Sequence, residues 1–142
     1  MSVVFLDANV FLDALLQRNE HEDSATILKA NKRSMFIYTT AACLQNVIYF
    51  LSKAGISNRS IINILDALLK NISLAQTNEK NFFSGLHAGF TDVEDAIQYH
   101  TALAIKDIDY FITSNIRDYK KALPQLPVIT PKQFLSLYNK NK

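Results

Sequence analysis

The chain has 142 residues, of which 49% are hydrophobic and 20% are charged, and this balance is typical of one packed domain spanning residues 1–142. The single cysteine, Cys43, excludes an internal disulfide and a cysteine-based zinc cluster. None of the three glycines begins a glycine-rich nucleotide loop, which argues against dinucleotide-binding and P-loop enzymes. Asp7 and Asp13 interrupt the apolar N-terminal stretch and argue against a signal peptide, and with the lone thiol this predicts a cytoplasmic protein. The charge-free stretch 34–52 has polar residues near its middle, so it is not expected to span a membrane.

The net charge of +2 conceals an uneven distribution of charged residues. Residues 1–28 hold five acids and one base, and residues 92–109 again hold five acids and one base. The segment 29–91 has seven bases and two acids, and six bases with one acid follow from residue 117 to the end. Because acidic and basic segments alternate, the near-neutral total neither favours nor excludes a nucleic acid partner.

The first predicted element is a strand at residues 3–6, a continuous apolar run of the kind buried on both faces of a parallel sheet. A helix is expected to follow it, with Asn9 as a suitable N-cap. A second helix is expected from Asp23 to about Arg33, and residues 35–38 predict the next strand.

The middle of the chain continues this alternation of strands and helices. Thr39 or Thr40 is expected to cap a helix that Gly55 closes, and Ser57 is expected to start another. Residues 72–75 then predict a short strand.

In the last part of the chain, Asn78 is expected to begin a helix, and Thr91 or Asp92 is expected to cap the next one, which reaches about Lys106. The remaining predicted elements are a strand at 110–113, a short helix from Asp118 to Leu123, a strand at 128–129 and a helix opened by Pro131. Parallel neighbours need crossover connections that carry helices, so this order predicts a three-layer α/β/α fold around a mainly parallel sheet of four to five strands.

Polar residues follow the predicted strands, at the edge of an open α/β sheet where ligands bind. Asp7 follows the first strand, residues 113–115 follow the strand at 110, and Asp118 comes three residues later. Asp92 and Asp95 are three residues apart at the start of one helix, so they share a helical face. Crowded carboxylates repel one another unless a cation neutralises them, and oxygen ligands favour Mg²⁺ or Mn²⁺ over zinc.

Each of these acids also has a purely structural interpretation. Asp7 and Asp92 are suitable N-caps for the helices that follow them, and Asp118 suits the N-terminus of its short helix. Glu94 fits the third helical position of a capping box opened by Thr91.

Several other polar and aromatic residues are expected to have no role in a site. The remaining acids and histidines of this kind, expected to be solvated or satisfied, are Asp13, Asp66, Asp107, Asp109, His21, His87 and His100. Aromatic residues at helical spacing are expected in the core rather than on a base-stacking surface, and these are Tyr49, Phe50, Phe82, Phe83 and Tyr99.

Three motifs resemble those of PIN-domain proteins, the group that contains the VapC-like toxin ribonucleases. They are Phe-Leu-Asp-Ala-Asn-Val at 5–10, Asp-Val-Glu-Asp-Ala-Ile-Gln-Tyr at 92–99 and Ile-Thr-Ser-Asn-Ile-Arg-Asp-Tyr at 112–119. With the strand-to-helix step at 128–131, the resemblance covers essentially the whole chain.

The resemblance implies a set of functional residues. The implied catalytic residues and ligands for Mg²⁺ or Mn²⁺ are Asp7, Asp95 and Asp118, with Asp92 as a further candidate ligand. The positions implied to support the site are Asn9, Asn46, Thr113 and Asn115.

One position departs from the family pattern. Active members often carry a second acid early in the helix after the second strand, where this chain has Gln45 and Asn46. An amide oxygen can still bind a hard cation, so Asn46 is the predicted neutral substitute. Weaker metal binding, a single ion or loss of catalysis would each be consistent with this change, and Asp92 or Glu94 are candidates to compensate for it.

The resemblance implies a metal-dependent endoribonuclease, the toxin of a type II toxin–antitoxin pair, that leaves 5′-phosphate ends. It also implies a homodimer and a small antitoxin protein that covers the acidic cleft. Contacts to the RNA backbone are expected from the basic residues Lys29, Lys32, Arg33, Arg117, Lys120 and Lys121.

Two alternative functions remain open from the sequence. The first is a nucleic-acid-binding PIN module without catalysis, because the second acid is missing. The second is a phosphotransferase with Asp7 as its nucleophile, although such enzymes carry an aspartate where this chain has Asn9.

Overall fold

A five-stranded sheet with the order β3-β2-β1-β4-β5 forms the centre of the computed structural model, which describes residues 1–30 and 33–140. All neighbouring strands are parallel. The strands are β1 (Ser2–Leu6), β2 (Met35–Thr40), β3 (Ile72–Ala75), β4 (Tyr110–Ile112) and β5 (Val128–Ile129). The expected α/β architecture with a parallel sheet is therefore confirmed, since every crossover carries helical structure.

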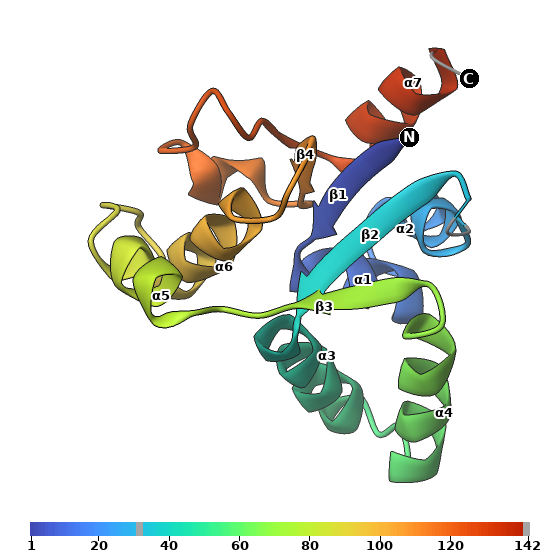
Figure 1. Cartoon of the computed structure of the whole chain (residues 1–142). Helices are drawn as coiled ribbons and strands as arrows, with labels where there is room; N and C mark the ends of the chain where they lie inside the picture. The colour runs from blue at the N-terminus through green and yellow to red at the C-terminus, as the bar shows by residue number, and fades with distance from the viewer. Residues whose placement is uncertain (31–32, 141–142) are drawn as a thin grey trace.

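Helices cover the sheet in two layers (Figure 1). The helices are α1 (Ala8–Leu15), α2 (His21–Leu28), α3 (Ala41–Lys53), α4 (Asn58–Leu68), α5 (Glu79–Leu86), α6 (Val93–Leu103), the 3-10 helix η1 (Ile116–Tyr119) and α7 (Pro131–Lys140). In one layer α1 contacts α2 and α3, and α2 contacts α7, whereas α5 packs on α6 in the other. Among the helices of the described residues, none has the length and apolar character needed to cross a bilayer.

The central strand β1 is buried on both faces. Val4, Phe5 and Leu6 have no exposed surface, and the ring of Phe5 stacks on that of Phe111 in β4 with centroids 5.0 Å apart. Burying each of these side chains contributes about 1.5–3 kcal/mol to folding. The hydrophobic core is therefore centred on the strand that ends at Asp7.

Side-chain caps begin most of the helices at the expected residues. Thr40, Ser57, Asn78 and Asp92 each accept a backbone N–H three residues ahead, and so they start α3, α4, α5 and α6. Gly55 follows α3 with φ of +87°, the left-handed conformation that glycine adopts without a steric cost. Of the two caps considered for α6, Asp92 is confirmed, so the interpretation of Glu94 as part of a capping box opened by Thr91 is wrong.

Two expected helix boundaries in the first part of the chain are wrong. Asp7, not Asn9, is the N-cap of α1: the helix begins directly after β1, and the Asp7 carboxylate accepts the Ala8 N–H. Helix α2 begins at His21 and ends at Leu28, so Asp23 lies in its first turn rather than at its cap. An acid in that turn still interacts favourably with the helix dipole.

Two helices in the last third of the chain also end earlier than predicted. Helix α6 ends at Leu103, and the chain then turns through Asp107, which has φ of +62°, before β4 begins. The expected helix from Asp118 to Leu123 is instead η1, which ends at Tyr119. The Tyr99 hydroxyl accepts the Leu123 N–H and donates to the Leu126 carbonyl, both at 2.7 Å, so a side chain replaces helical hydrogen bonds there.

Candidate active site

Asp7 lies at the carboxyl end of the central strand and is only 7% exposed. Its Oδ1 accepts the Ala8 N–H at 2.8 Å. Its Oδ2 accepts the hydroxyl of Thr113 at 3.0 Å and that of Tyr119 at 2.8 Å. The helix cap and the expected site carboxylate are thus the same side chain, and both of its oxygens are oriented.

Thr113 and Asn9 hold this arrangement from the loop after β4 and the first turn of α1. Thr113 is fully buried, and its Oγ1 accepts the Asn9 side-chain amide at 2.9 Å. The Asn9 Oδ1 accepts the Ser114 N–H at 3.0 Å. Both residues therefore stand where the resemblance implied supporting positions, next to Asp7.

Tyr119 is a residue of this site that sequence reasoning missed. Its ring packs against Phe111 and Phe90, with centroids 4.8 Å and 5.9 Å away, which fixes the direction of its hydroxyl toward Asp7. The only signal in the sequence is an aromatic residue with a polar tip directly after Asp118.

The start of α6 supplies two further carboxylates. The Asp92 Oδ1 accepts the Asp95 N–H at 3.1 Å, so Asp92 is the N-cap and Asp95 the third residue of the helix. Asp92 is exposed, whereas Asp95 is half-buried. The structural interpretation of Asp92 is therefore confirmed, and it does not remove the side chain from the site.

Asp118 and Asn115 complete the edge from the segment after β4. The Asn115 side-chain amide donates to the Asp118 Oδ2 at 2.5 Å, and both residues belong to the turn around η1. Asn115 is thus placed to orient Asp118, as the resemblance implied for a supporting residue.

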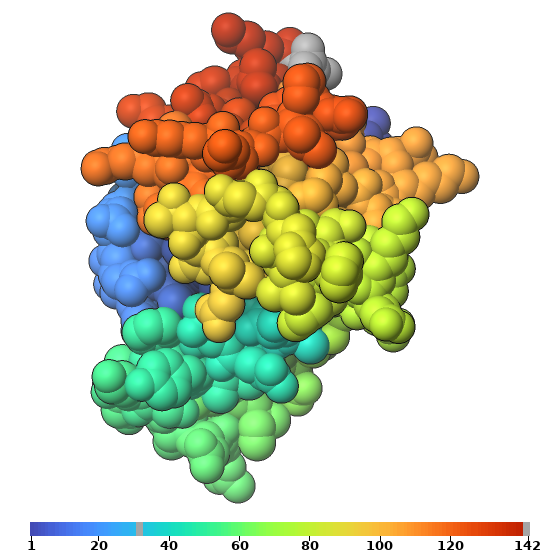
Figure 2. Space-filling model, turned by 90° about the vertical axis from the view of Figure 1, so that its left-hand side faces the viewer, coloured from blue at the N-terminus to red at the C-terminus, as the bar shows by residue number. Residues whose placement is uncertain are grey.

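Two adjoining cavities border Asp7 and Asp95. The smaller one, of about 270 Å³, is lined by all four predicted carboxylates, Asp7, Asp92, Asp95 and Asp118. The larger one, of about 530 Å³, lies between α3 and α6 and extends to Phe82 of α5. Figure 2 shows this face of the molecule, where segments coloured blue, teal, yellow and orange surround a recess.

Burial and mutual repulsion shift the ionisation of these groups. Burial raises the pKa of Asp7 above its ordinary value, while hydrogen bonds from Tyr119 and Ala8 oppose the shift. Burial also raises the pKa of Asp95 to about 7, with the negative charges of Asp7 and Asp92 as the next causes. Burial and the nearby carboxylates raise the pKa of Tyr119, so its hydroxyl remains a hydrogen-bond donor.

The chemistry of these donors fits a hard divalent cation. Carboxylate oxygens, an amide oxygen and water are the ligands that Mg²⁺ and Mn²⁺ take, and a cation would relieve the repulsion that raises the pKa of Asp95. Across residues 1–30 and 33–140, no three side chains of Asp, Glu, His or Cys are grouped closely enough to hold one metal ion. The carboxylates line one cavity, and to share a cation they must approach one another.

The helix after β2 faces the site with amides in place of an acid. Asn46 lines both cavities, and Gln45 lines the larger one. Both side chains are exposed, so neither is held in the core. Asn46 therefore lies where a neutral substitute for the second acid was expected, beside Asp7 and Asp95.

A hydrogen-bonded link fixes α3 relative to α6 across the larger cavity. The Thr40 Oγ1 accepts the Cys43 N–H at 3.1 Å and donates to the Gln98 Oε1 at 2.5 Å. Burial raises the pKa of the Cys43 thiol to about 11, so this cysteine stays protonated at neutral pH. The link positions the two helices that carry Asn46 and Asp95.

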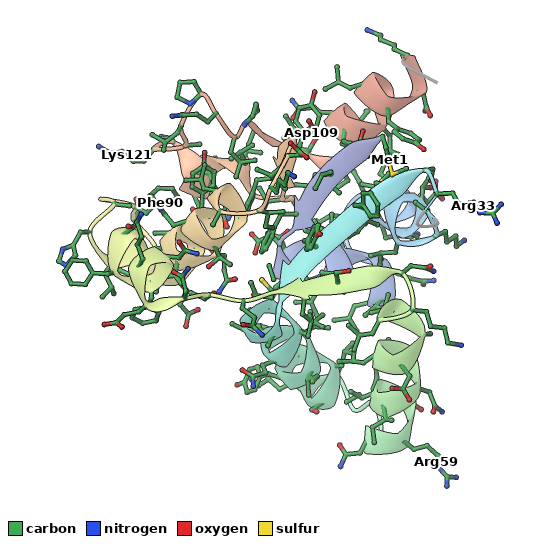
Figure 3. All side chains as sticks on the ribbon, in the orientation of Figure 1. Met1, Arg33, Arg59, Phe90, Asp109 and Lys121 are labelled. Atoms are coloured by element: carbon green, nitrogen blue, oxygen red, sulfur yellow. The ribbon has the colours of Figure 1, made fainter. Side chains whose placement is uncertain are left out.

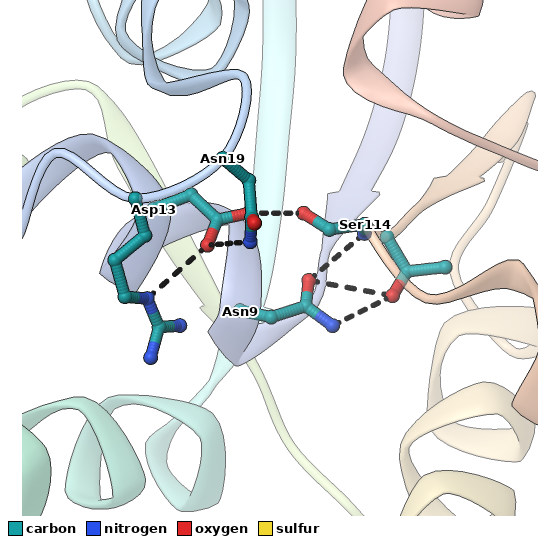
Figure 4. A network of polar contacts seen from close by, with 6 residues as sticks. Asn9, Asp13, Asn19 and Ser114 are labelled. Atoms are coloured by element: carbon teal, nitrogen blue, oxygen red, sulfur yellow. Dashed lines mark hydrogen bonds and ion pairs between the residues drawn. The ribbon is translucent and has the colours of Figure 1, made fainter.

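The prediction for Asp13 is wrong. It was expected to be solvated, yet it is 2% exposed. Its Oδ1 accepts from Arg18 Nε at 3.3 Å and Asn19 Nδ2 at 3.2 Å, and its Oδ2 accepts the Ser114 hydroxyl. Figure 4 shows how this carboxylate joins the turn after α1 to the loop that also contacts Asn9. The loop after β4 supplies the hydroxyl that satisfies Asp13, which the sequence around Asp13 does not reveal.

Most of the aromatic residues expected in the core are exposed instead. Tyr99 is buried as expected, but Tyr49, Phe50, Phe82 and Phe83 are 37–63% exposed. Phe50 lines the smaller cavity and Phe82 the larger one. The prediction from helical spacing is therefore wrong for α3 and α5, whose buried faces carry other residues.

The basic residues expected to contact RNA fall into two groups. Arg117, Lys120 and Lys121 are exposed in and after η1, on the same edge as the cavities but outside their walls. Lys29 and Arg33 precede β2 and so belong to the opposite edge of the sheet, and Lys32 lies outside the described residues. Figure 3 shows Lys121 and Arg33 on opposite sides of the molecule, so the second group does not border this site.

Comparisons with known proteins agree with this architecture. The sequence matches the PIN domain over residues 3–117. The structure is similar to that of VapBC2 from Rickettsia felis bound to a DNA fragment from its promoter, with a TM-score of 0.64 and 18% identity over 90% of this chain and 98% of that one. It is also similar to FitAB bound to the IR36 DNA fragment, with a TM-score of 0.62 and 14% identity over 90% of this chain and 94% of that one.

The comparison with curated proteins gives no match. At 18% and 14% identity, the two solved structures show a shared fold only. The match to the PIN domain family covers most of the sequence and shows the family. With its parallel sheet and the polar edge around Asp7, this chain belongs to the PIN domain family.

Proposed function

We propose that this protein is a metal-dependent endoribonuclease that hydrolyses phosphodiester bonds in RNA. One observation carries the proposal: Asp7, Asp92, Asp95 and Asp118, from three separate parts of the chain, line one cavity at the carboxyl edge of the sheet. Such a concentration of carboxylates, with Asp7 buried and Asp95 and Asp118 half-buried, costs stability unless a cation binds it. Membership of the PIN domain family supports nuclease chemistry at this edge.

The proposed ligands for Mg²⁺ or Mn²⁺ are Asp7, Asp95 and Asp118, with Asp92 and the amide oxygen of Asn46 as neighbouring donors. When bound, the cation would polarise a phosphate oxygen and lower the pKa of a water molecule; the water oxygen would bond to phosphorus as the P–O3′ bond breaks and the 3′ oxygen leaves with a proton. Thr113 and Tyr119 hold the Asp7 carboxylate in one orientation by donating to its Oδ2. Asn115 does the same for Asp118.

A second function is favoured by the amide at the position of the missing acid. Asn46 borders both cavities without adding a charge, which weakens cation binding relative to a carboxylate. A PIN domain that binds RNA without cleaving it would show salt-sensitive binding and no products.

The proposed partners are RNA, a small antitoxin protein and a second copy of the chain. The fold likeness to VapBC2 and FitAB supports an antitoxin partner. The exposed aromatics Tyr49, Phe50, Phe82 and Phe83 give α3 and α5 apolar surface that a protein partner would cover. The buried, protonated thiol of Cys43 is compatible with the proposed cytoplasmic setting.

The proposed activity is tested by incubating purified protein with a mixed RNA pool in Mg²⁺ or Mn²⁺. The wild type is expected to produce fragments with 5′-phosphate ends, and Asp95→Asn and Asp118→Asn are expected to be about 100-fold slower. Asp66→Asn, the same change at an exposed residue of α4, is the matched control and should cleave like the wild type. No cleavage with either metal, or equal rates in Asp95→Asn and wild type, would reject the catalytic proposal in favour of binding alone.

A further inference from the structure

We infer that Arg18 is a phosphate-binding residue of this site, placed to contact a phosphodiester of the nucleic acid substrate. The inference rests on the proposed function and adds a residue that neither the sequence motifs nor the family resemblance identified. Three independent features of the structure support it: the anchoring of the guanidinium, the backbone on either side of it, and the charges around it.

The guanidinium is anchored at one end and accessible at the other. Arg18 Nε donates to Asp13 Oδ1 at 3.3 Å, and the Asp13 side chain is 3% exposed whereas that of Arg18 is 42% exposed. This contact uses one of the five N–H donors of the guanidinium. The two terminal nitrogens remain to form the paired hydrogen bonds that suit a phosphate group.

Asp13 orients Arg18 but also accepts hydrogen bonds from two other residues. The same carboxylate accepts hydrogen bonds from Asn19 at 3.2 Å and from the Ser114 hydroxyl (Figure 4). Its charge is therefore shared among three donors, and two of them would still satisfy it without Arg18. Without Arg18, Asp13 would keep these two neutral hydrogen bonds but lose its charged partner, so folding and binding must be measured separately in an Arg18 variant.

The backbone around Arg18 is held in an unusual conformation. Gln17 has φ of +53° and Asn19 has φ of +47°, so both neighbours of Arg18 are in the left-handed region. The Arg18 N–H donates to the Asp13 carbonyl at 2.9 Å, which ties the turn to the end of α1. Non-glycine residues keep such a conformation only where surrounding contacts determine it, and these positions concentrate at functional sites.

Arg18 lines the same small cavity as the four carboxylates. Of the described residues in the walls of this cavity, only Arg18 is positively charged, and its ion-pair partner Asp13 lies outside the cavity. A phosphate entering the cavity is repelled by Asp7, Asp95 and their neighbours, and a cation on the rim reduces this repulsion. The arrangement places an oriented cation beside the groups proposed to act on the phosphodiester.

The test compares Arg18→Gln with Arg59→Gln, the same change at an exposed residue in the first turn of α4, away from the site (Figure 3). Glutamine keeps a hydrogen-bond donor for Asp13 but removes the charge. Arg18→Lys keeps the charge but loses the paired geometry, and it serves as a second variant if Arg18→Gln folds poorly. Thermal melting of each variant reports on folding separately from binding.

Two measurements are made on these proteins. The first is cleavage of a short single-stranded RNA in Mn²⁺, from which kcat and KM are obtained. The second is equilibrium binding of the same RNA, and of DNA of the same sequence, across a range of salt concentrations. For binding, each arginine variant is combined with Asp95→Asn in the full chain, and EDTA is present. The two nucleic acids distinguish an RNA from a DNA source of the phosphate.

Arg18→Gln is expected to raise KM and the Kd for RNA about tenfold, and Arg18→Lys by less. Arg18→Gln should also reduce the slope of log Kd against log salt concentration by about 0.7, which corresponds to the loss of one phosphate contact to a single strand. Arg59→Gln should leave all these values unchanged. A structural role alone would lower the melting temperature without changing the salt slope.

The outcomes separate this inference from the proposed function. Cleavage by the wild type with unchanged KM, Kd and salt slope in Arg18→Gln would overturn the role of Arg18 and leave the nuclease proposal in place. Binding that depends on Arg18 without any cleavage would support Arg18 and overturn the nuclease proposal. The absence of both cleavage and binding would overturn both, and tighter binding of DNA than of RNA would overturn RNA as the source of the phosphate.

Discussion

The hydroxyls of Thr113 and Tyr119 explain how a carboxylate as buried as Asp7 is kept in place. Both donate to its Oδ2, from residues 106 and 112 positions away in the sequence. In the absence of a cation, these two hydroxyls and the Ala8 N–H, which donates to Oδ1, compensate in part for burying the charge. The carboxylate is thus oriented before any ligand arrives.

Replacing Thr113 by valine tests this compensation. Thr113→Val keeps the shape of the fully buried side chain but removes the donor to Asp7 and the acceptor for Asn9. The free energy of unfolding is expected to fall by about 1–3 kcal/mol in urea titrations. Thr113→Ser, which keeps the hydroxyl, should lose less, and a valine variant as stable as the wild type would contradict the expectation.

The raised pKa of Asp95 makes stability depend on pH in a defined direction. Its pKa is about 7 in the folded protein against an ordinary value of 3.8, so the folded chain holds this proton more tightly than the unfolded chain. The stabilisation from the protonated group is complete below the unfolded value and is lost as pH rises through about 7.

Asp95→Asn removes this titration. In EDTA, the wild type is expected to lose more melting temperature than Asp95→Asn as pH rises from about 4 to about 7. Asp66→Asn, on the exposed face of α4, should follow the wild-type profile. Parallel melting profiles for Asp95→Asn and wild type would show that Asp95 is not perturbed.

At the scale of elements, local signals in the sequence predicted where most helices begin. The caps at Thr40, Ser57, Asn78 and Asp92 depend on residues three positions apart, so they are visible in the sequence. The end of η1 was not predictable, because Tyr99 satisfies the backbone at Leu123 from 24 residues away. The backbone conformation there is determined by a long-range side-chain contact rather than by local helix propensity.

The close packing of α5 on α6 sets the position of the helix that carries Asp95. A Cβ added to Gly85 would lie 2.6 Å from the Ile97 Cα and 2.9 Å from the Ile97 N, and backbone atoms cannot yield as a flexible side chain does. This glycine is required by the approach of two helices rather than by a turn. Its role could not be read from the sequence, which shows only a glycine late in a helix.

Gly85→Ala is therefore expected to lower the free energy of unfolding by about 1–3 kcal/mol, as an overpacked core position. Urea unfolding monitored by circular dichroism measures this change. Ser84→Ala, the exposed neighbour in α5, is the matched control and should stay within about 0.5 kcal/mol of the wild type. Equal stability of the two variants would show that the α5–α6 contact is loose.

At the scale of the whole molecule, the fold gathers charges that are separated in the sequence. The acidic segments 1–28 and 92–109 meet at the carboxyl edge of the sheet through Asp7, Asp92 and Asp95. The basic residues near η1 reach the same edge, but Lys29 and Arg33 do not. The sequence predicted which acids would converge because they follow strands or begin the helix before one.

The contributions of Tyr119 and Arg18 could not be predicted in the same way. Tyr119 reaches Asp7 only because η1 packs on the aromatic residues of β4 and α6. Arg18 is the one base in the acidic segment 1–28, which marks it as unusual, but its place in the cavity depends on the turn after α1. Both require the tertiary fold.

Thermal melting during a titration with Mn²⁺ tests most directly whether the carboxylates around Asp7 form a metal site. A cation that binds only the folded state stabilises it by about 2.7 kcal/mol at 100 times its Kd. Millimolar Mn²⁺ is expected to raise the melting temperature of the wild type and of Asp66→Asn, and to raise that of Asp7→Asn and Asp95→Asn much less. The same increase in all four proteins would contradict a metal site at these carboxylates.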